Sequence, residues 1–197
     1  TDPGNMNKSK QEILNHALSC FMKNGVENTT IADIRGASGV SVGSIYHHFG
    51  NKDGIVAALF MEGVNDHSRL QEAALEKANT AEDGVKAVVG CYIDWINDHP
   101  DWARFVFRYR SLVEHSKKTE EEKEQRKTHF NRLRDWFSPH IIEGEIQKLP
   151  FEVYHTLIVG PAQAFALRWL SGRTKTDLIQ HKNLYAEAAW QAIKVKN

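Results

Sequence analysis

The apolar residues of this chain recur at helical spacing over most of its length. Over residues 8–24, side chains such as Ile13, Ala17 and Phe21 fall on one face, and Gly25 follows where the pattern stops. Further patterns of this kind cover residues 51–64, 82–97, 101–114, 130–141, 150–171 and 176–195. No run alternates between apolar and polar residues over the length of a strand. The pattern therefore predicts an all-α protein.

Two features interrupt this pattern in the second half of the chain. Gly160-Pro161 falls inside residues 150–171, and we expect a kink or a break there because proline removes a backbone hydrogen bond and clashes with the preceding turn. Residues 117–129 contain no apolar side chain, and nine of these 13 positions are charged. We interpret this run as a solvated helix face or a mobile connection, because it offers nothing to a core.

Residues 28–54 carry the most informative pattern of the sequence. Thr30 and Asp33 have the spacing of a capping box, which predicts the start of a short helix. Gly39 can take the left-handed conformation of a tight turn, and Ser41 is a favourable N-cap for a second helix. A helix, a short turn that contains glycine and a second helix are the layout of a helix-turn-helix motif.

The second helix of this motif divides into two faces. Ile45 and Phe49 are four residues apart and are predicted to point to the core. The opposite face is small at its N-terminal end, where Val42 can touch a thymine methyl group in a major groove. At the C-terminal end of this face, Tyr46 and His47 can donate hydrogen bonds to phosphate or base acceptors.

The stretch from Thr30 to Phe49, followed by Asn51-Lys52-Asp53-Gly54-Ile55, resembles the N-terminal signature of the TetR family of bacterial transcriptional regulators. The resemblance implies a three-helix DNA-binding domain over residues 6–52 and a larger helical ligand-binding and dimerisation domain over residues 53–197, with about nine helices in all. It also implies a homodimer that acts on a double-stranded DNA operator, usually as a repressor, and releases it when a small molecule binds. By position, the DNA contacts would be Thr30, Ser41, Val42, Gly43, Ser44, Tyr46, His47 and Lys52. Many family members carry a second aromatic residue where this chain has His47.

Aromatic residues gather in the second part of the chain. All five tryptophans, and fifteen of the nineteen aromatic residues, follow residue 90. A packed core explains any one of them, but together they exceed what plain packing needs, and aromatic walls between helices commonly line apolar ligand pockets. We therefore predict a partly apolar effector, with Arg108 or Gln163 as further polar anchors. The predicted pocket residues are Trp95, Trp102, Phe105, Tyr109, Trp136, Phe137, Tyr154, His155 and Phe165.

Small residues mark the last two helical segments. They are Gly160, Ala162, Ala164 and Ala166 in the first, and Ala186, Ala188, Ala189 and Ala192 in the second. Two such helices from each subunit can approach closely and form the four-helix interface of a twofold dimer. The sequence therefore predicts a homodimer through residues 150–171 and 176–195. A helical pair packed within a monomer is the alternative.

The balance of charge is neutral over the whole chain but not over the predicted motif. The chain has 25 Lys+Arg and 25 Asp+Glu, which by itself argues against a strongly basic nucleic-acid binder. Residues 34–52, however, contain Arg35 and Lys52 and no carboxylate. Lys52 and the free N–H groups of the following helix would form a phosphate seat. Protonation of His47 and His48 below about pH 6.5 would add further positive charge near phosphate.

The sequence also bears on the compartment. The longest apolar run, residues 55–61, has seven residues, far fewer than the roughly 18 of a membrane span. No basic-then-apolar leader opens the chain. Cys20 and Cys91 lie inside apolar patterns, which favours reduced thiols over a disulfide. We expect a cytoplasmic protein with no membrane partner.

Two other classes of function remain as alternatives. A helical enzyme is the weaker one, because no Ser/His/Asp order, no metal-spaced Cys/His set and no phosphate-cradling glycine loop stands out. His47 and His48 are neighbours on a helix and point about 100° apart, so they cannot easily share a metal. We therefore expect no enzymatic activity, no bound metal and no cofactor. The other alternative is a family relative that acts as a sensing or interaction protein without DNA binding.

Overall fold

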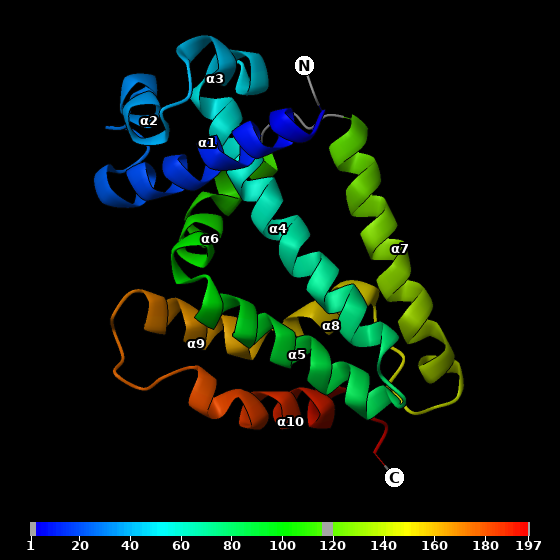
Figure 1. Ribbon diagram of the computed structural model, residues 1–197. Helices are drawn as coiled ribbons and strands as arrows, with labels where there is room; N and C mark the ends of the chain where they lie inside the picture. The colour runs from blue at the N-terminus through cyan, green and yellow to red at the C-terminus, as the bar shows by residue number, and fades with distance from the viewer. Residues whose placement is uncertain (1–2, 116–119, 197) are drawn as a thin grey trace. The chain divides into compact units, whose positions relative to one another are not determined.

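The computed structural model describes residues 3–115 and 120–196, and most of them are helical (Figure 1). The elements are α1 (Pro3–Asn24), α2 (Ile31–Ser38), α3 (Val42–Phe49), α4 (Lys52–Glu76), α5 (Ala81–Asp98), α6 (Pro100–His115), α7 (Glu120–Ile142), α8 (Phe151–Ile158), α9 (Gly160–Leu170), the 3-10 helix η1 (Ile179–His181) and α10 (Lys182–Ile193). Within these ranges the β-structure is limited to an isolated bridge between Ile146 and Lys194. The all-α prediction is confirmed, with ten α-helices in the described chain instead of about nine.

The C-terminal helices differ from the predicted ones in their boundaries. The predicted helix over residues 150–171 is two helices, α8 and α9, which meet at Val159. Pro161 lies in the first turn of α9, where its missing N–H does no harm. The predicted helix over residues 176–195 begins late, because a 3-10 turn precedes α10, which starts at Lys182.

Helix α7 begins inside the charged run of residues 117–129. Its residues 123–128 are exposed, so the interpretation as a solvated helix face is confirmed for this part. Residues 117–119 of the run lie outside the described residues. In the described parts of the chain, no helix is long and apolar enough to cross a membrane.

The chain folds as two compact units. The first consists of the residues up to Val64 together with Asp101–His115, and the second of Asn65–Pro100 together with the chain after residue 119. Helix α4 contributes to both units because the division falls between Val64 and Asn65. The predicted boundary after residue 52 separates two functions, DNA binding and ligand binding. The division into compact units does not test this boundary, so it stays a prediction.

In the first unit, α1, α2 and α3 pack around a small apolar core. Ile34 and Ile45 are 0% and 1% exposed. Phe21 of α1 stacks on Phe105 of α6, with ring centroids 5.9 Å apart. The predicted end of the first helix at Gly25 is confirmed, since this residue has a φ of 80° and donates its N–H to the carbonyl of Phe21.

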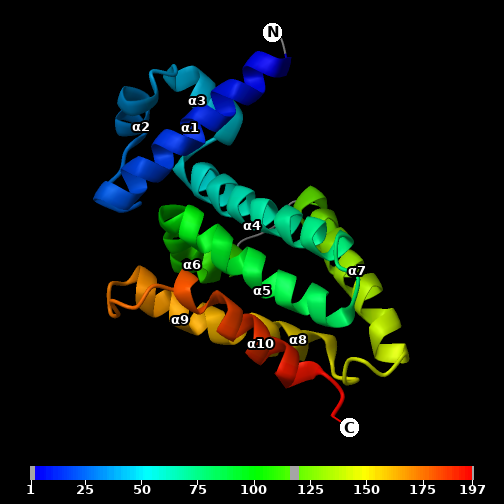
Figure 2. The ribbon, with the colours of Figure 1, turned by 60° about the horizontal axis from the view of Figure 1, so that its bottom comes forward.

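In the second unit, α10 runs alongside α5, as both Figure 1 and Figure 2 show. Val85 and Ile93 of α5 and Ile193 of α10 are fully buried. Apolar side chains therefore join these two helices, although they lie about a hundred residues apart in the sequence.

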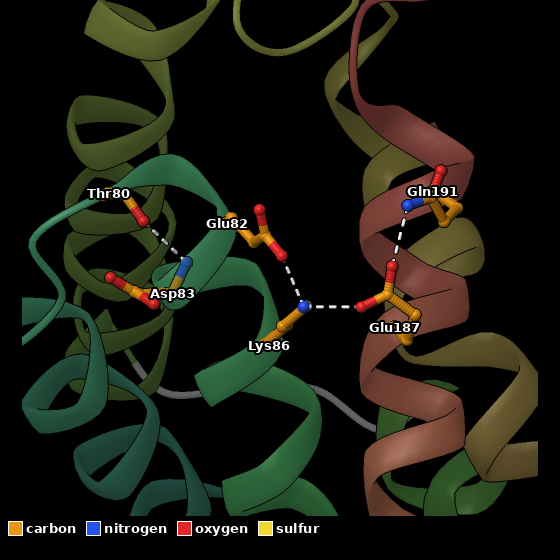
Figure 3. A network of polar contacts seen from close by, with 6 residues as sticks. All are labelled: Thr80, Glu82, Asp83, Lys86, Glu187 and Gln191. Carbon is orange, nitrogen blue, oxygen red and sulfur yellow. Dashed lines mark hydrogen bonds and ion pairs between the residues drawn. The ribbon is translucent and has the colours of Figure 1, made fainter.

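Ion pairs join the polar edges of α5 and α10. Lys86 Nζ lies 2.5 Å from a carboxylate oxygen of Glu82 and 2.5 Å from one of Glu187 (Figure 3). Lys182 Nζ lies 2.7 Å from Asp94 Oδ2. Exposed pairs of this kind add little to stability. Each helix carries its lysine before its carboxylate, and the pairs Lys86–Glu187 and Asp94–Lys182 join the two helices in antiparallel directions. These pairs therefore favour one register of α10 along α5.

Candidate nucleic-acid interface

Helix α2 begins with a complete capping box. The Thr30 hydroxyl oxygen accepts a hydrogen bond from the N–H of Asp33 over 3.1 Å, and the Thr30 N–H donates to Asp33 Oδ2 over 2.8 Å. The Thr30 hydroxyl also donates to the same carboxylate oxygen, 2.7 Å away. The backbone bond from Thr30, and then the side-chain bond, lower the pKa of Asp33. Thr30, a predicted DNA contact, is exposed at this helix start.

A glycine and a serine shape the turn between α2 and α3. Gly39 has a φ of 69°, and its N–H donates to the carbonyl of Arg35 over 2.9 Å, which ends α2. Ser41 is the N-cap of α3, and its hydroxyl oxygen accepts the N–H of Ser44 over 3.2 Å. The two short helices and the turn between them have the predicted layout of a helix-turn-helix motif.

Helix α3 presents small and polar side chains on its exposed side. Ile45 and Phe49 are 1% and 8% exposed, whereas Val42 and Tyr46 are 39% and 49% exposed. Of the other candidates, Ser41, Gly43 and His47 are exposed and Ser44 is half-buried. This helix contains no carboxylate. Its exposed side can therefore approach an anionic surface and offer hydrogen-bond donors to it.

The two histidines of α3 have different surroundings. Their rings lie 5.6 Å apart, and the ring of His48 lies 5.9 Å from that of Phe49. Burial, followed by the nearby charges of His47 and Lys10, lowers the pKa of His48. In the chain without DNA the half-buried position of His48 therefore favours the neutral ring, and its protonation beside phosphate stays a prediction.

The ammonium group of Lys52 lies against the loop that follows α1. Its Nζ donates to the carbonyls of Val26 and Thr29 over 2.7 and 3.0 Å, and the carbonyl of Glu27 lies 3.4 Å away. Lys52 thus connects the start of α4 to this loop, a role that the sequence pattern did not reveal. Its predicted contact with phosphate stays a prediction.

Gly54, in the first turn of α4, lies directly against the end of α3. A Cβ atom at Gly54 would lie 1.9 Å from the carbonyl oxygen of Phe49. The same corner is closed by Asn51, whose side-chain oxygen accepts the N–H of Gly54 over 2.9 Å and whose N–H donates to the carbonyl of Phe49 over 2.8 Å. Glycine is therefore required for this approach of α3 and α4. A glycine inside a helical pattern is the signal that marks such a position.

Three of the predicted ligand-binding residues belong to α6 in the first unit. Trp102 Nε1 donates to the carbonyl of Leu59 over 2.9 Å. Phe105 is 1% exposed, and its ring lies 4.8 Å from that of Tyr109. The guanidinium of Arg108 lies 5.6 Å from the centre of the Tyr109 ring. Packing and hydrogen bonds within this unit account for the positions of these aromatic rings.

The other predicted ligand-binding residues belong to the second unit. Phe137 and Tyr154 stack with ring centroids 5.2 Å apart, and Trp136 meets Phe137 edge-on at 5.0 Å. Trp95 is buried, and its Nε1 donates to Asp66 Oδ2 over 3.0 Å. Of the remaining two, His155 is exposed and Phe165 is half-buried. Ring contacts thus gather Trp136, Phe137 and Tyr154, and ligand binding by any of the nine residues stays a prediction.

The N-terminal part of the chain matches a family of known proteins. Residues 13–59 match the family model described as bacterial regulatory proteins of the tetR family. The chain is also 28% identical to the HTH-type transcriptional repressor AcnR of Corynebacterium diphtheriae, over 91% of this chain and 90% of that protein. The chain is thus similar to TetR-family regulators, over residues 13–59 by the family model and over most of its length by the comparison with AcnR. The resemblance noted in the sequence is thereby confirmed.

Another relative matches over a shorter stretch. The HTH-type transcriptional regulator TtgR of Pseudomonas putida is 37% identical over 43% of this chain and 37% of that protein. These relatives are transcriptional regulators, which confirms the prediction that the chain is not an enzyme.

Solved structures of TetR-family proteins share the fold. A TetR family transcription regulator from Marinobacter aquaeolei has a TM-score of 0.80 at 18% identity, over 99% of this chain and 100% of that one. The regulator FadR from Bacillus subtilis, solved in complex with stearoyl-CoA, has a TM-score of 0.74 at 22% identity, over 93% of this chain and 98% of that one. These neighbours agree with the predicted arrangement of an N-terminal helix-turn-helix domain followed by a larger helical part.

Proposed function

We propose that this TetR-family protein is a transcriptional repressor that binds a palindromic DNA operator as a homodimer and releases it when a small, partly apolar effector binds. The observation that carries the proposal is the exposed, carboxylate-free side of α3, held by a capped helix-turn-helix. In this proposal α3 enters the major groove, and the two copies in a dimer meet half-sites about 34–36 Å apart. We expect the protein in the bacterial cytoplasm, where such an operator lies.

Helix α3 would supply two kinds of DNA contact. Tyr46 can bond to phosphate and would act on all sequences alike, whereas Val42 and His47 can meet base edges and would select among sequences. Gly43 leaves room for the helix to enter the groove. Replacement of Tyr46 should therefore weaken every complex, and replacement of Val42 or His47 should change the preferred sequence.

Selection of bound sequences from random DNA tests this proposal. A recovered palindrome supports it, and the operator found in this way then serves for gel shifts. Tyr46→Ala should weaken operator binding at least about tenfold, which corresponds to the loss of roughly one hydrogen bond to a charged group. Tyr46→Phe separates the hydroxyl from the ring. Unchanged affinity in Tyr46→Ala argues against the assigned surface, and failure to select any sequence favours a sensing or interaction protein.

The dimer in this proposal uses exposed apolar side chains of α9 and α10. Leu167 and Leu184 are 48% and 65% exposed. The exposed small residues of these helices are Ala164, Ala188 and Ala192, whereas Ala162, Ala166, Ala186 and Ala189 are buried within the subunit. Part of the small-residue pattern thus serves internal packing. The exposed part supports an isologous contact between two copies.

The effector in this proposal is small and partly apolar. The related fold of FadR holds stearoyl-CoA, which supports a partly apolar ligand class for this chain. A ligand releases the operator only if it binds more tightly to the form of the protein that does not fit DNA than to the form that does. Stearoyl-CoA and fractions of a bacterial extract are the first probes. Loss of the gel shift on addition of one probe supports the effector, and retention with every fraction argues against ligand control.

A further inference from the structure

The C-terminal end of α7 gathers one imidazole and two carboxylates. His140, Glu143 and Glu145 each offer a ligand atom, and these atoms all lie within 4.8 Å of one another. His140 and Glu143 are three residues apart and share one side of the helix end. Gly144, with a φ of 77°, reverses the chain so that Glu145 Oε1 comes within 3.0 Å of His140 Nδ1. The sequence His-x-x-Glu-Gly-Glu thus brings three donors to one place.

Backbone and ring contacts hold these donors in position. The N–H groups of Glu145 and Ile146 both donate to the carbonyl of His140, over 2.9 and 3.1 Å. The rings of Trp136 and His140 lie 4.6 Å apart. Ile146 also pairs with Lys194 in an antiparallel bridge. The donor set is therefore preorganised, which reduces the entropy lost when a ligand is bound.

The local charge at this helix end favours a cation. The carbonyl groups at the C-terminus of a helix carry partial negative charge, and carboxylates are unfavourable there. In residues 3–115 and 120–196, the ion-pair partner of Glu145 is His140, which is charged only if protonated, and neither Glu143 nor Glu145 pairs with a lysine or an arginine. Two carboxylates thus lie beside a negative helix end without a fixed positive partner.

We propose that His140, Glu143 and Glu145 form a binding site for a divalent transition-metal ion such as Zn²⁺. One imidazole nitrogen and two carboxylate oxygens are a donor set that suits this ion. With bonds of about 2.0–2.1 Å, neighbouring donors of a tetrahedral zinc ion lie roughly 3.3 Å apart. The 3.0 Å between His140 Nδ1 and Glu145 Oε1 is close to this spacing.

The ion takes the place of the hydrogen between His140 Nδ1 and Glu145. His140 then binds the ion through Nδ1 and keeps a ring proton on Nε2, and a water molecule completes four ligands. The bound ion also tightens the link to the end of α10. This link consists of the Glu145 carbonyl, which accepts the N–H of Val195 over 3.0 Å, and the Gln147 N–H, which donates to the carbonyl of Ile193 over 2.8 Å.

Calorimetric titration of the untagged full chain with Zn²⁺ at pH 7.5, without DNA, tests the site. We expect one ion per chain, a rise in the melting temperature, and an affinity that falls at least about tenfold in His140→Asn and in Glu143→Gln. Glu143 is exposed, so its replacement leaves the packing intact even if His140→Asn disturbs the contact with Trp136. His16→Asn, at an exposed histidine of α1, is the matched control and should bind zinc like the original chain. No uptake of zinc, or equal affinity in Glu143→Gln, overturns the proposal.

Discussion

Gly54 allows the close approach of the end of α3 to the start of α4. A methyl group at this position would lie 1.9 Å from the Phe49 carbonyl oxygen, so the backbone itself has to move. We expect Gly54→Ala to lower the free energy of unfolding by at least about 2 kcal/mol, in the range of other overpacked sites. Urea unfolding measures this effect.

Gly36 provides the matched control for Gly54. It lies exposed in α2, and a Cβ atom there would meet nothing within 4 Å. Alanine is the better helix former by up to about 1 kcal/mol, so Gly36→Ala should leave stability unchanged or raise it. Equal losses at both positions would show that the close approach at Gly54 is not the cause.

His48 makes the stability of the first unit depend on pH. Its pKa is lower in the folded chain than the ordinary 6.5, so the unfolded chain binds the proton more readily. The contribution of His48 is therefore complete above pH 6.5 and is lost as the pH falls through the folded pKa. Unfolding at a series of pH values should show a smaller loss on acidification in His48→Gln. An NMR titration that gave His48 a pKa at or above 6.5 would contradict this cause.

At the scale of elements, the capping box of α2 should contribute measurably to folding. Thr30→Ala removes the acceptor for the Asp33 N–H and the hydroxyl donor to its carboxylate. We expect a loss of about 1 kcal/mol, the usual effect of removing an N-cap, while Thr30→Ser keeps both groups and most of the stability. Thermal unfolding without DNA separates this effect from DNA contact. If Thr30→Ser loses as much stability as Thr30→Ala, the threonine methyl group is the cause and the capping box is not.

The helices were predictable where local signals mark their ends. Gly25 and Gly39 stop α1 and α2, Ser41 caps α3, and Pro161 marks the break between α8 and α9. Each signal acts through backbone groups within a few residues. The start of α10 at Lys182 was missed, because the 3-10 turn before it continues the same apolar spacing.

At the scale of the whole molecule, an exposed leucine of α10 should control assembly. Leu184 is 65% exposed, and Leu184→Glu would place a charge in the proposed interface between two copies. We expect dimers of the original chain and monomers of the variant by sedimentation at micromolar concentration. Leu112→Glu is the control, because Leu112 is 63% exposed in the first unit, outside this interface. Dimers in both variants would show that the interface does not include Leu184.

The candidate DNA surface could be recognised from the sequence, but the tertiary contacts that hold it in place could not. Lys52 bonds to carbonyls more than twenty residues earlier in the chain, and the spacing of side chains along one helix contains no information on such a partner. The aromatic residues likewise suggested one pocket. In the structure these residues belong to both units. The sequence could not show this division, because periodicity indicates that a side chain points inward but not which neighbour it contacts.

The sequence by itself determined the all-α class, most of the helices and the capped helix-turn-helix, because propensity, capping and turn chemistry act between residues close in the chain. The tertiary structure decided which atoms meet. It brought the Gly54 backbone against Phe49 and buried Ala186 and Ala189 within the subunit. It also returned Glu145 to His140. Those contacts depend on how helices pack and how turns close, and the side-chain pattern of a single segment does not specify either.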